Sequence, residues 1–198
     1  INNDIQKTFK ESSISKYGDS KQGLKTGNNA YFIRNWFEVS NNKIGMKWFP
    51  VETGGNFRKW YGNGITVLNW ENDGEEIKNY KDDNGRLRSR PQGLQYAFTK
   101  GITWSTSAGD NPSFRISDER FLFESSGSKF FLNEGTDRLN LFCAYFNSYV
   151  AKSFIEMFSP GLGISEGAIK SLPFLEDSNI SEAKSSQNIS ISKQDWDA

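Results

Sequence analysis

The chain has 198 residues, enough for one domain with its own core. It contains no histidine and a single cysteine, which excludes histidine-based acid–base catalysis and an internal disulfide and argues against a zinc site. Acids and bases balance overall, but the first 164 residues carry 21 basic against 18 acidic side chains. This modest positive bias allows a nucleic-acid partner without requiring one.

The first part of the chain predicts a sheet-rich domain behind a polar start. Residues 1–22 are polar, and we interpret them as a lead-in segment to a domain spanning 23–175. From there to residue 132, short apolar and aromatic runs alternate with turn signals of the Asn-Asn, Gly-Gly, Asn-Asp-Gly and Asp-Asn-Gly kind. Such alternation is typical of many short strands and hairpins.

The pattern becomes helical after residue 136. Leu139, Phe142, Phe146, Val150 and Phe154 recur at spacings of three and four, which predicts one long amphipathic helix at about 137–158. A short helix is expected over 165–171, and the Ser-, Asn- and Lys-rich residues 176–198 are interpreted as a linker to a following domain. The predicted fold class is α+β, with mostly short antiparallel strands and hairpins plus that helix.

Motifs that carry catalysis are not found in this sequence. No glycine-rich loop stands between a strand and a helix, as a dinucleotide or phosphate site requires, and no pair of carboxylates is singled out by its spacing. We therefore expect the chain to bind a partner and not to catalyse a reaction by itself. The absence of a long apolar run and the single cysteine favour a cytoplasmic location without membrane contact.

The segment "GGNFRKWYGN" (54–63) mixes aromatic and basic side chains between glycines and asparagines. Arg58 and Lys59 suit phosphates, while Trp60 and Tyr61 suit stacking on a base or a sugar. The alternative is a hairpin whose aromatics face the core while the cations face water, and composition favours this alternative.

The segment "NGRLRSRPQ" (84–92) is a stronger electrostatic signal. Arg86, Arg88 and Arg90 are spaced by two, so an extended backbone places all three on one side. Such a row suits DNA phosphates, and one guanidinium can bind a guanine edge. A charged strand edge that prevents sheet-to-sheet pairing explains the row equally well. Further on, "GITWSTSAGDNPSFR" brings Arg115 close to Trp104 and several hydroxyls, although ordinary strand and turn residues give the same pattern.

Taken in order, several longer motifs resemble one known family. They are "GLKTGNNAYFIRNWFEV", "KWFPVETGGNFRKWYGN", "VLNWENDGEEIKN", "RSRP", "GITWS" and "ISISKQDWD". The chain resembles the PglX-type adenine-specific DNA methyltransferases of BREX phage-defence systems, in the region after the catalytic domain. The resemblance covers nearly the whole chain. The S-adenosylmethionine loop and the Asn/Asp-Pro-Pro-Tyr/Phe motif of that family do not occur here, since all five prolines are isolated.

The resemblance implies a DNA target recognition domain that selects the adenine to be methylated in duplex DNA. It implies S-adenosylmethionine as the cofactor of the parent enzyme only, with a catalytic domain in the same parent chain. Other defence subunits or a phage-encoded inhibitor are further expected partners. The expected DNA contacts are Arg86, Arg88, Arg90, Arg58, Lys59, Arg115 and Lys25. A carbohydrate-binding module or a protein-interaction module rich in exposed aromatics is the alternative.

Overall fold

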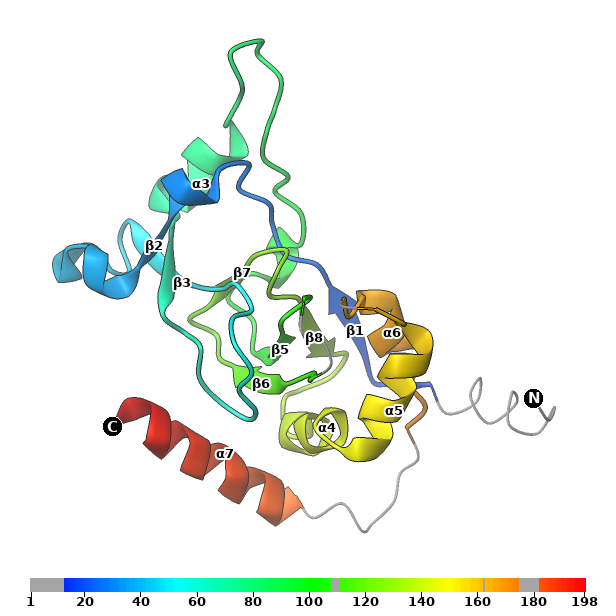
Figure 1. The fold of residues 1–198 in the computed structure, drawn as a ribbon. Helices are drawn as coiled ribbons and strands as arrows, with labels where there is room; N and C mark the ends of the chain where they lie inside the picture. The colour runs from blue at the N-terminus through cyan, green and yellow to red at the C-terminus, as the bar shows by residue number, and fades with distance from the viewer. Residues whose placement is uncertain (1–12, 108–110, 162, 175–181) are drawn as a thin grey trace.

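The computed structural model describes residues 13–107, 111–161, 163–174 and 182–198. It is an α+β structure built on two four-stranded sheets, which confirms the predicted fold class (Figure 1). The strands are β1 (Gly18–Lys21), β2 (Ile33–Asn35), β3 (Trp48–Glu52), β4 (Thr66–Asn69), β5 (Gly101–Trp104), β6 (Phe114–Ser117), β7 (Leu122–Phe123) and β8 (Lys129–Leu132). Single 3-10 turns occur at Ile14–Lys16, Trp36–Glu38, Asn41–Lys43 and Leu94–Tyr96.

The first sheet has the order β1-β8-β5-β6 and is antiparallel throughout. Three helices pack on it: α4 (Leu139–Phe146), α5 (Tyr149–Phe158) and α6 (Glu166–Lys170). Their shared core is aromatic, with Trp104, Phe114 and Phe130 of the sheet against Phe142 and Phe146 of α4. Burial of these large side chains is the main stabilising term of this half of the molecule.

The second sheet has the order β2-β4-β3-β7, in which only the β3–β7 pair is parallel. It packs with α2 (Asn29–Phe32) and α3 (Glu71–Lys78) around a smaller core that contains Phe32, Leu68 and Ile77. Within α3, residues 72–74 have positive φ angles, so regular helix begins only after them.

The predicted helix over 137–158 is two helices, α4 and α5, that meet at residues 147–148. The Asn147 side chain leaves the helix surface to bond the Phe114 backbone, accepting from its N–H at 3.1 Å and donating to its carbonyl at 2.8 Å. Ser148 then caps α5 by accepting from the Ala151 N–H at 3.1 Å. The hydrophobic spacing continues through this break, so periodicity alone did not reveal it.

The predicted end segments also differ from the structure. Residues 1–12 lie outside the described part, but 13–22 are no lead-in, since β1 forms an edge strand of the first sheet. Residues 175–181 of the expected linker are likewise outside it, and the rest forms helix α7 (Glu182–Asp197), which packs against α4. Its less exposed positions are two serines, Ser185 and Ser192, together with Ile189 and Trp196. A serine-rich helix of this kind resembles a linker in composition.

Within the described residues, no helix combines the length and apolar character that a membrane span requires.

Candidate nucleic-acid interface

The segment that follows α3 folds back on itself as a hairpin. The backbone N–H of Arg88 donates to the Tyr80 carbonyl at 2.9 Å, and that of Asp82 donates to the Arg86 carbonyl at 2.9 Å. The hairpin projects away from both sheets, above α3 in Figure 1. Its base is anchored, because the Tyr80 ring packs edge-on against Phe32 of the second core at a centroid distance of 5.1 Å.

Three arginines follow the returning strand of this hairpin. Arg86, Arg88 and Arg90 are exposed, while Ser89 between them is buried, as expected for an extended strand. Lys25 joins them, since its backbone exchanges two hydrogen bonds with that of Arg90, at 2.9 and 2.8 Å, and its side chain is exposed. Among the described residues, none of these four side chains has a hydrogen-bond or ion-pair partner. We call these four residues the basic face.

Arg58 and Lys59, in contrast, are engaged within the molecule. Arg58 donates to the Tyr61 carbonyl at 2.9 Å and to the Asp195 carboxylate of α7 at 2.7 Å, and its guanidinium lies 4.8 Å from the Trp196 ring. Lys59 donates to the Asn147 carbonyl at 3.1 Å. Both cations therefore stabilise the loop and its neighbours in this structure.

Helix α7 completes the attachment of that loop. The Ser192 hydroxyl bonds the carbonyls of Lys59 and Tyr61, each at 3.1 Å. Gly62 lies where loop and helix meet, with φ of 118°, and a Cβ there would lie 2.4 Å from Arg58 and 2.9 Å from Trp196. Sequence reasoning missed this contact, because residues 182–197 carried no apolar stripe that would predict a packed helix.

Arg115 is fully buried in β6, so its predicted role as a DNA contact is corrected. It donates to the carbonyls of Gly54 at 3.0 Å and Arg58 at 3.3 Å. Glu52 and Lys129 are the other charged groups of this buried network. Burial raises the pKa of Glu52 and lowers that of Lys129 to about 8, while their mutual attraction opposes both shifts. All three side chains are buried, so they cannot reach a phosphate.

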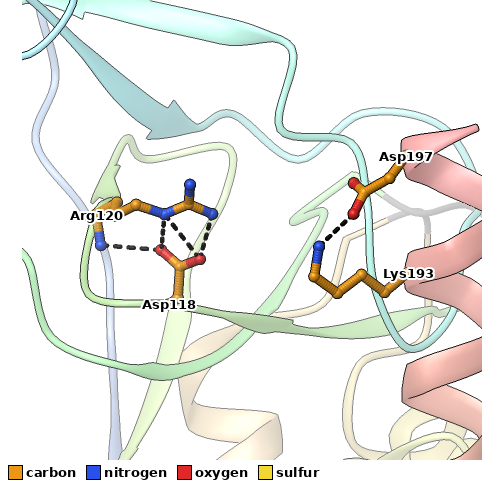
Figure 2. A network of polar contacts seen from close by, with 4 residues as sticks. All are labelled: Asp118, Arg120, Lys193 and Asp197. Atoms are coloured by element: carbon orange, nitrogen blue, oxygen red, sulfur yellow. Dashed lines mark hydrogen bonds and ion pairs between the residues drawn. The ribbon is translucent and has the colours of Figure 1, made fainter.

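A pocket of about 250 Å³ opens between the second sheet, β6 and the end of α7. Its walls include the aromatic rings of Trp36, Tyr61, Phe121 and Trp196. Two ion pairs border it (Figure 2): Asp118 with Arg120, at distances down to 2.6 Å, and Asp197 with Lys193. In each pair the two charges neutralise each other. The pocket therefore presents aromatic rings and balanced charge, whereas the basic face presents positive charge alone.

No family model matches this chain. Two curated relatives do. The chain is 37% identical over 193 residues to the adenine-specific methyltransferase PglX of Lacticaseibacillus casei (strain Zhang), an alignment that covers 90% of this chain and 16% of the relative. It is 33% identical over 184 residues to the adenine-specific methyltransferase BrxX of Escherichia coli O9:H4 (strain HS), which covers 88% of this chain and 14% of the relative.

The chain thus spans about one sixth of the length of these curated relatives. Both similarities extend over nearly all of it, as the ordered motifs predicted. The resemblance inferred from those motifs is confirmed: this chain is homologous to one segment of the PglX-type adenine-specific methyltransferases.

Proposed function

We propose that this chain is the DNA target recognition domain of an adenine-specific methyltransferase that acts in phage defence. The observation that supports this most is the basic face: four cations, unpaired among the described residues, on and beside a hairpin that projects from the body of the domain. Cations without internal partners are available to DNA phosphates, and extended arginines present forked donors to phosphates or base edges.

In this proposal the domain docks on duplex DNA and determines which adenine the parent enzyme methylates. An adenine must leave the base stack before its amino group can be modified, so the recognition domain has to hold the duplex in a fixed register. Phosphate contacts supply most of the affinity and set that register. The rest of the parent, in the cytoplasm, supplies the catalytic residues and the S-adenosylmethionine site, and other defence subunits or a phage-encoded inhibitor are further proposed partners.

The test is binding of a fluorescent mixed-sequence duplex, measured by anisotropy at 50 and 200 mM salt, with this chain and with the parent enzyme. If four phosphates are neutralised, the affinity falls about 150-fold over this range. Replacing Arg86, Arg88 and Arg90 by Gln is expected to remove most of this salt dependence.

The matched control carries the same charge change elsewhere, at the exposed residues Lys43, Arg120 and Lys184. It should retain the full dependence on salt. Equal effects of the two triple variants, or binding of the parent that ignores salt, contradict the proposed basic face.

A carbohydrate-binding module is the second candidate, and the aromatic pocket beside α7 is the observation that favours it. Rings such as those of Tyr61 and Trp196 suit the faces of a sugar, and the ion pairs of Figure 2 offer hydrogen bonds to its hydroxyls. Sugar stacking depends little on salt, so oligosaccharide binding that is indifferent to salt, with no DNA binding, would favour this candidate.

A protein-interaction module is the third candidate. Trp36, Phe37 and Met46 are more than half exposed near the second sheet, and Tyr149 and Met157 are similarly exposed on α5. Retention of a purified defence subunit by this chain, lost when Trp36 and Phe37 are replaced by Ser, would favour this candidate over DNA binding.

A further inference from the structure

The tip of the hairpin differs in chemistry from the strand behind it. Residues 83–86, Asp-Asn-Gly-Arg, are all exposed. Asp83 and Asn84 bring a carboxylate and an amide to the turn of the hairpin, whereas Arg88, Arg90 and Lys25 at its base are cations only. No described side chain bonds the Asp83 carboxylate or the Asn84 amide. The hairpin therefore presents both donors and acceptors at its end and donors alone at its base.

This difference in chemistry indicates that the tip and the base of the hairpin contact different parts of the DNA. A carboxylate brought against DNA phosphates is repelled, so a tip built to hold phosphates would not carry Asp83. The edges of the bases are different, since cytosine and adenine expose amino donors in the major groove. An Asp accepts from cytosine N4, an Asn pairs with adenine N6 and N7, and an Arg pairs with guanine O6 and N7.

The turn that holds the tip is also preformed. The Asp82 side chain accepts from the backbone N–H groups of Asn84 at 3.0 Å and Arg86 at 2.9 Å, and Gly85, with φ of 75°, closes the turn by donating to the Asp82 carbonyl at 2.9 Å. The Asp82 carboxylate is occupied by these two bonds, so Asp82 positions the tip and does not itself contact a ligand. Because the backbone is fixed before any ligand arrives, less conformational entropy is lost when the tip side chains are bound.

The dimensions agree with the major groove. Two hydrogen-bonded strands lie about 4.8 Å apart, so a hairpin with its side chains fits a groove about 12 Å wide. The hairpin extends from the Tyr80–Arg88 pair to Asn84. The two strand residues that lead from this pair to the turn at Asp82 rise by about 7 Å, and the turn with its side chains adds to this, so the reach matches the groove depth of about 8.5 Å. The tip can therefore touch base edges while its base remains at the level of the phosphates.

We infer that Asp83, Asn84 and Arg86 contact base edges of the recognition site in the major groove, while Arg88, Arg90 and Lys25 bind the flanking phosphates. This inference rests on the proposed function. It assigns sequence discrimination to the tip and sequence-independent affinity to the base of the hairpin. Leu87, which is 51% exposed on the opposite side of the strand from Arg86 and Arg88, is placed for apolar contact with a thymine methyl group.

The experiment uses the intact parent methyltransferase and a randomised duplex library, with bound sequences counted at two salt concentrations. Asp83→Asn, Asn84→Ala and Arg86→Lys are the tip variants, and Arg88→Gln with Arg90→Gln is the base variant. Each tip variant is expected to change the preference at one or two positions by about 10- to 100-fold. The base variant is expected to weaken all sequences alike and to reduce the salt slope by about two phosphates.

Thermal unfolding of each variant at matched concentration verifies that it is folded. If the tip variants keep the original preference while the base variant weakens binding to all sequences, the tip assignment is wrong and the proposed function stands. If neither set alters binding to DNA, the proposed function fails with it.

Discussion

The hairpin of residues 80–90 and the loop of residues 54–63 look alike in sequence and behave differently in the structure. Both place cations among apolar or aromatic residues, next to glycine and asparagine. In the hairpin, Arg86, Arg88 and Arg90 have no partner among the described residues. In the loop, Arg58 and Lys59 are both bonded internally. The composition of a segment did not determine whether its cations are available to a ligand.

The difference follows from how each segment satisfies its own backbone. The hairpin satisfies its backbone groups by pairing across its two strands and by bonds to the Asp82 side chain, so its backbone does not need the arginine side chains. The loop is irregular, with positive φ at Trp60 and Asn63, and its carbonyls need other donors. Arg115 serves those of Gly54 and Arg58, while Ser192 serves that of Tyr61. In this irregular loop, Arg58 and Arg115 therefore donate to the loop's own carbonyls.

Arg115→Met tests this contrast with the largest expected effect. The substitution leaves the Arg58 and Gly54 carbonyls short of donors and Glu52 without its nearest buried guanidinium, so the free energy of unfolding should fall by about 3–5 kcal/mol. Urea unfolding monitored by tryptophan fluorescence measures it. The triple Gln variant of the hairpin should change stability by less than about 0.5 kcal/mol. Similar losses of unfolding free energy in the two variants would contradict the distinction between internally bonded cations and cations without a partner.

The buried network also predicts a dependence of stability on pH. The pKa of Lys129 is about 8 in the folded state and 10.5 ordinarily, because burial disfavours its charge. Between these values the unfolded chain binds more protons, so the free energy of unfolding should rise with pH, by about 2 kcal/mol from pH 7.5 to 10. Subtracting the unfolding curve of Lys129→Met, pH by pH, isolates this contribution. A flat difference would mean that Lys129 titrates as an exposed lysine.

The sequence predicted the strands and the exposed arginines of the hairpin better than it predicted the burial of Arg115, because the former depend on local geometry. Spacing by two in 86–90 correctly predicted three exposed arginines on one strand, because Pro91 and the Asn-Gly turn impose local geometry. The burial of Arg115 depends on carbonyls 57 and 61 residues away. No local pattern encodes such a contact. A hydrophobic pattern likewise does not predict that α7 packs on the domain, because serines make part of that contact.

The attachment of α7 should respond to Arg58→Ala with an intermediate effect. The substitution removes the bond to Asp195 and the contact with Trp196, which together are worth about 1–2 kcal/mol at a partly exposed site. Hydrogen exchange of the α7 amides should accelerate about 5- to 30-fold, while the amides of β5 and β8 keep their protection. Lys81→Ala, at an exposed position on the hairpin, is the control. Uniform acceleration across the sheet would show that Arg58 supports the whole fold and not only this helix.

Asp82→Ala should have a small effect on stability and a purely local effect on order. The residue lies at the end of a projecting hairpin, so losing its two side-chain bonds should change global unfolding by less than about 1 kcal/mol. The amides of Asn84 and Arg86, which donate to it, should nevertheless exchange several-fold faster. Asp83→Ala changes the same charge one residue away without removing a described bond, and it should leave both amides unchanged. Equal exchange rates of the two amides in both variants would show that backbone pairing alone fixes the geometry of the tip.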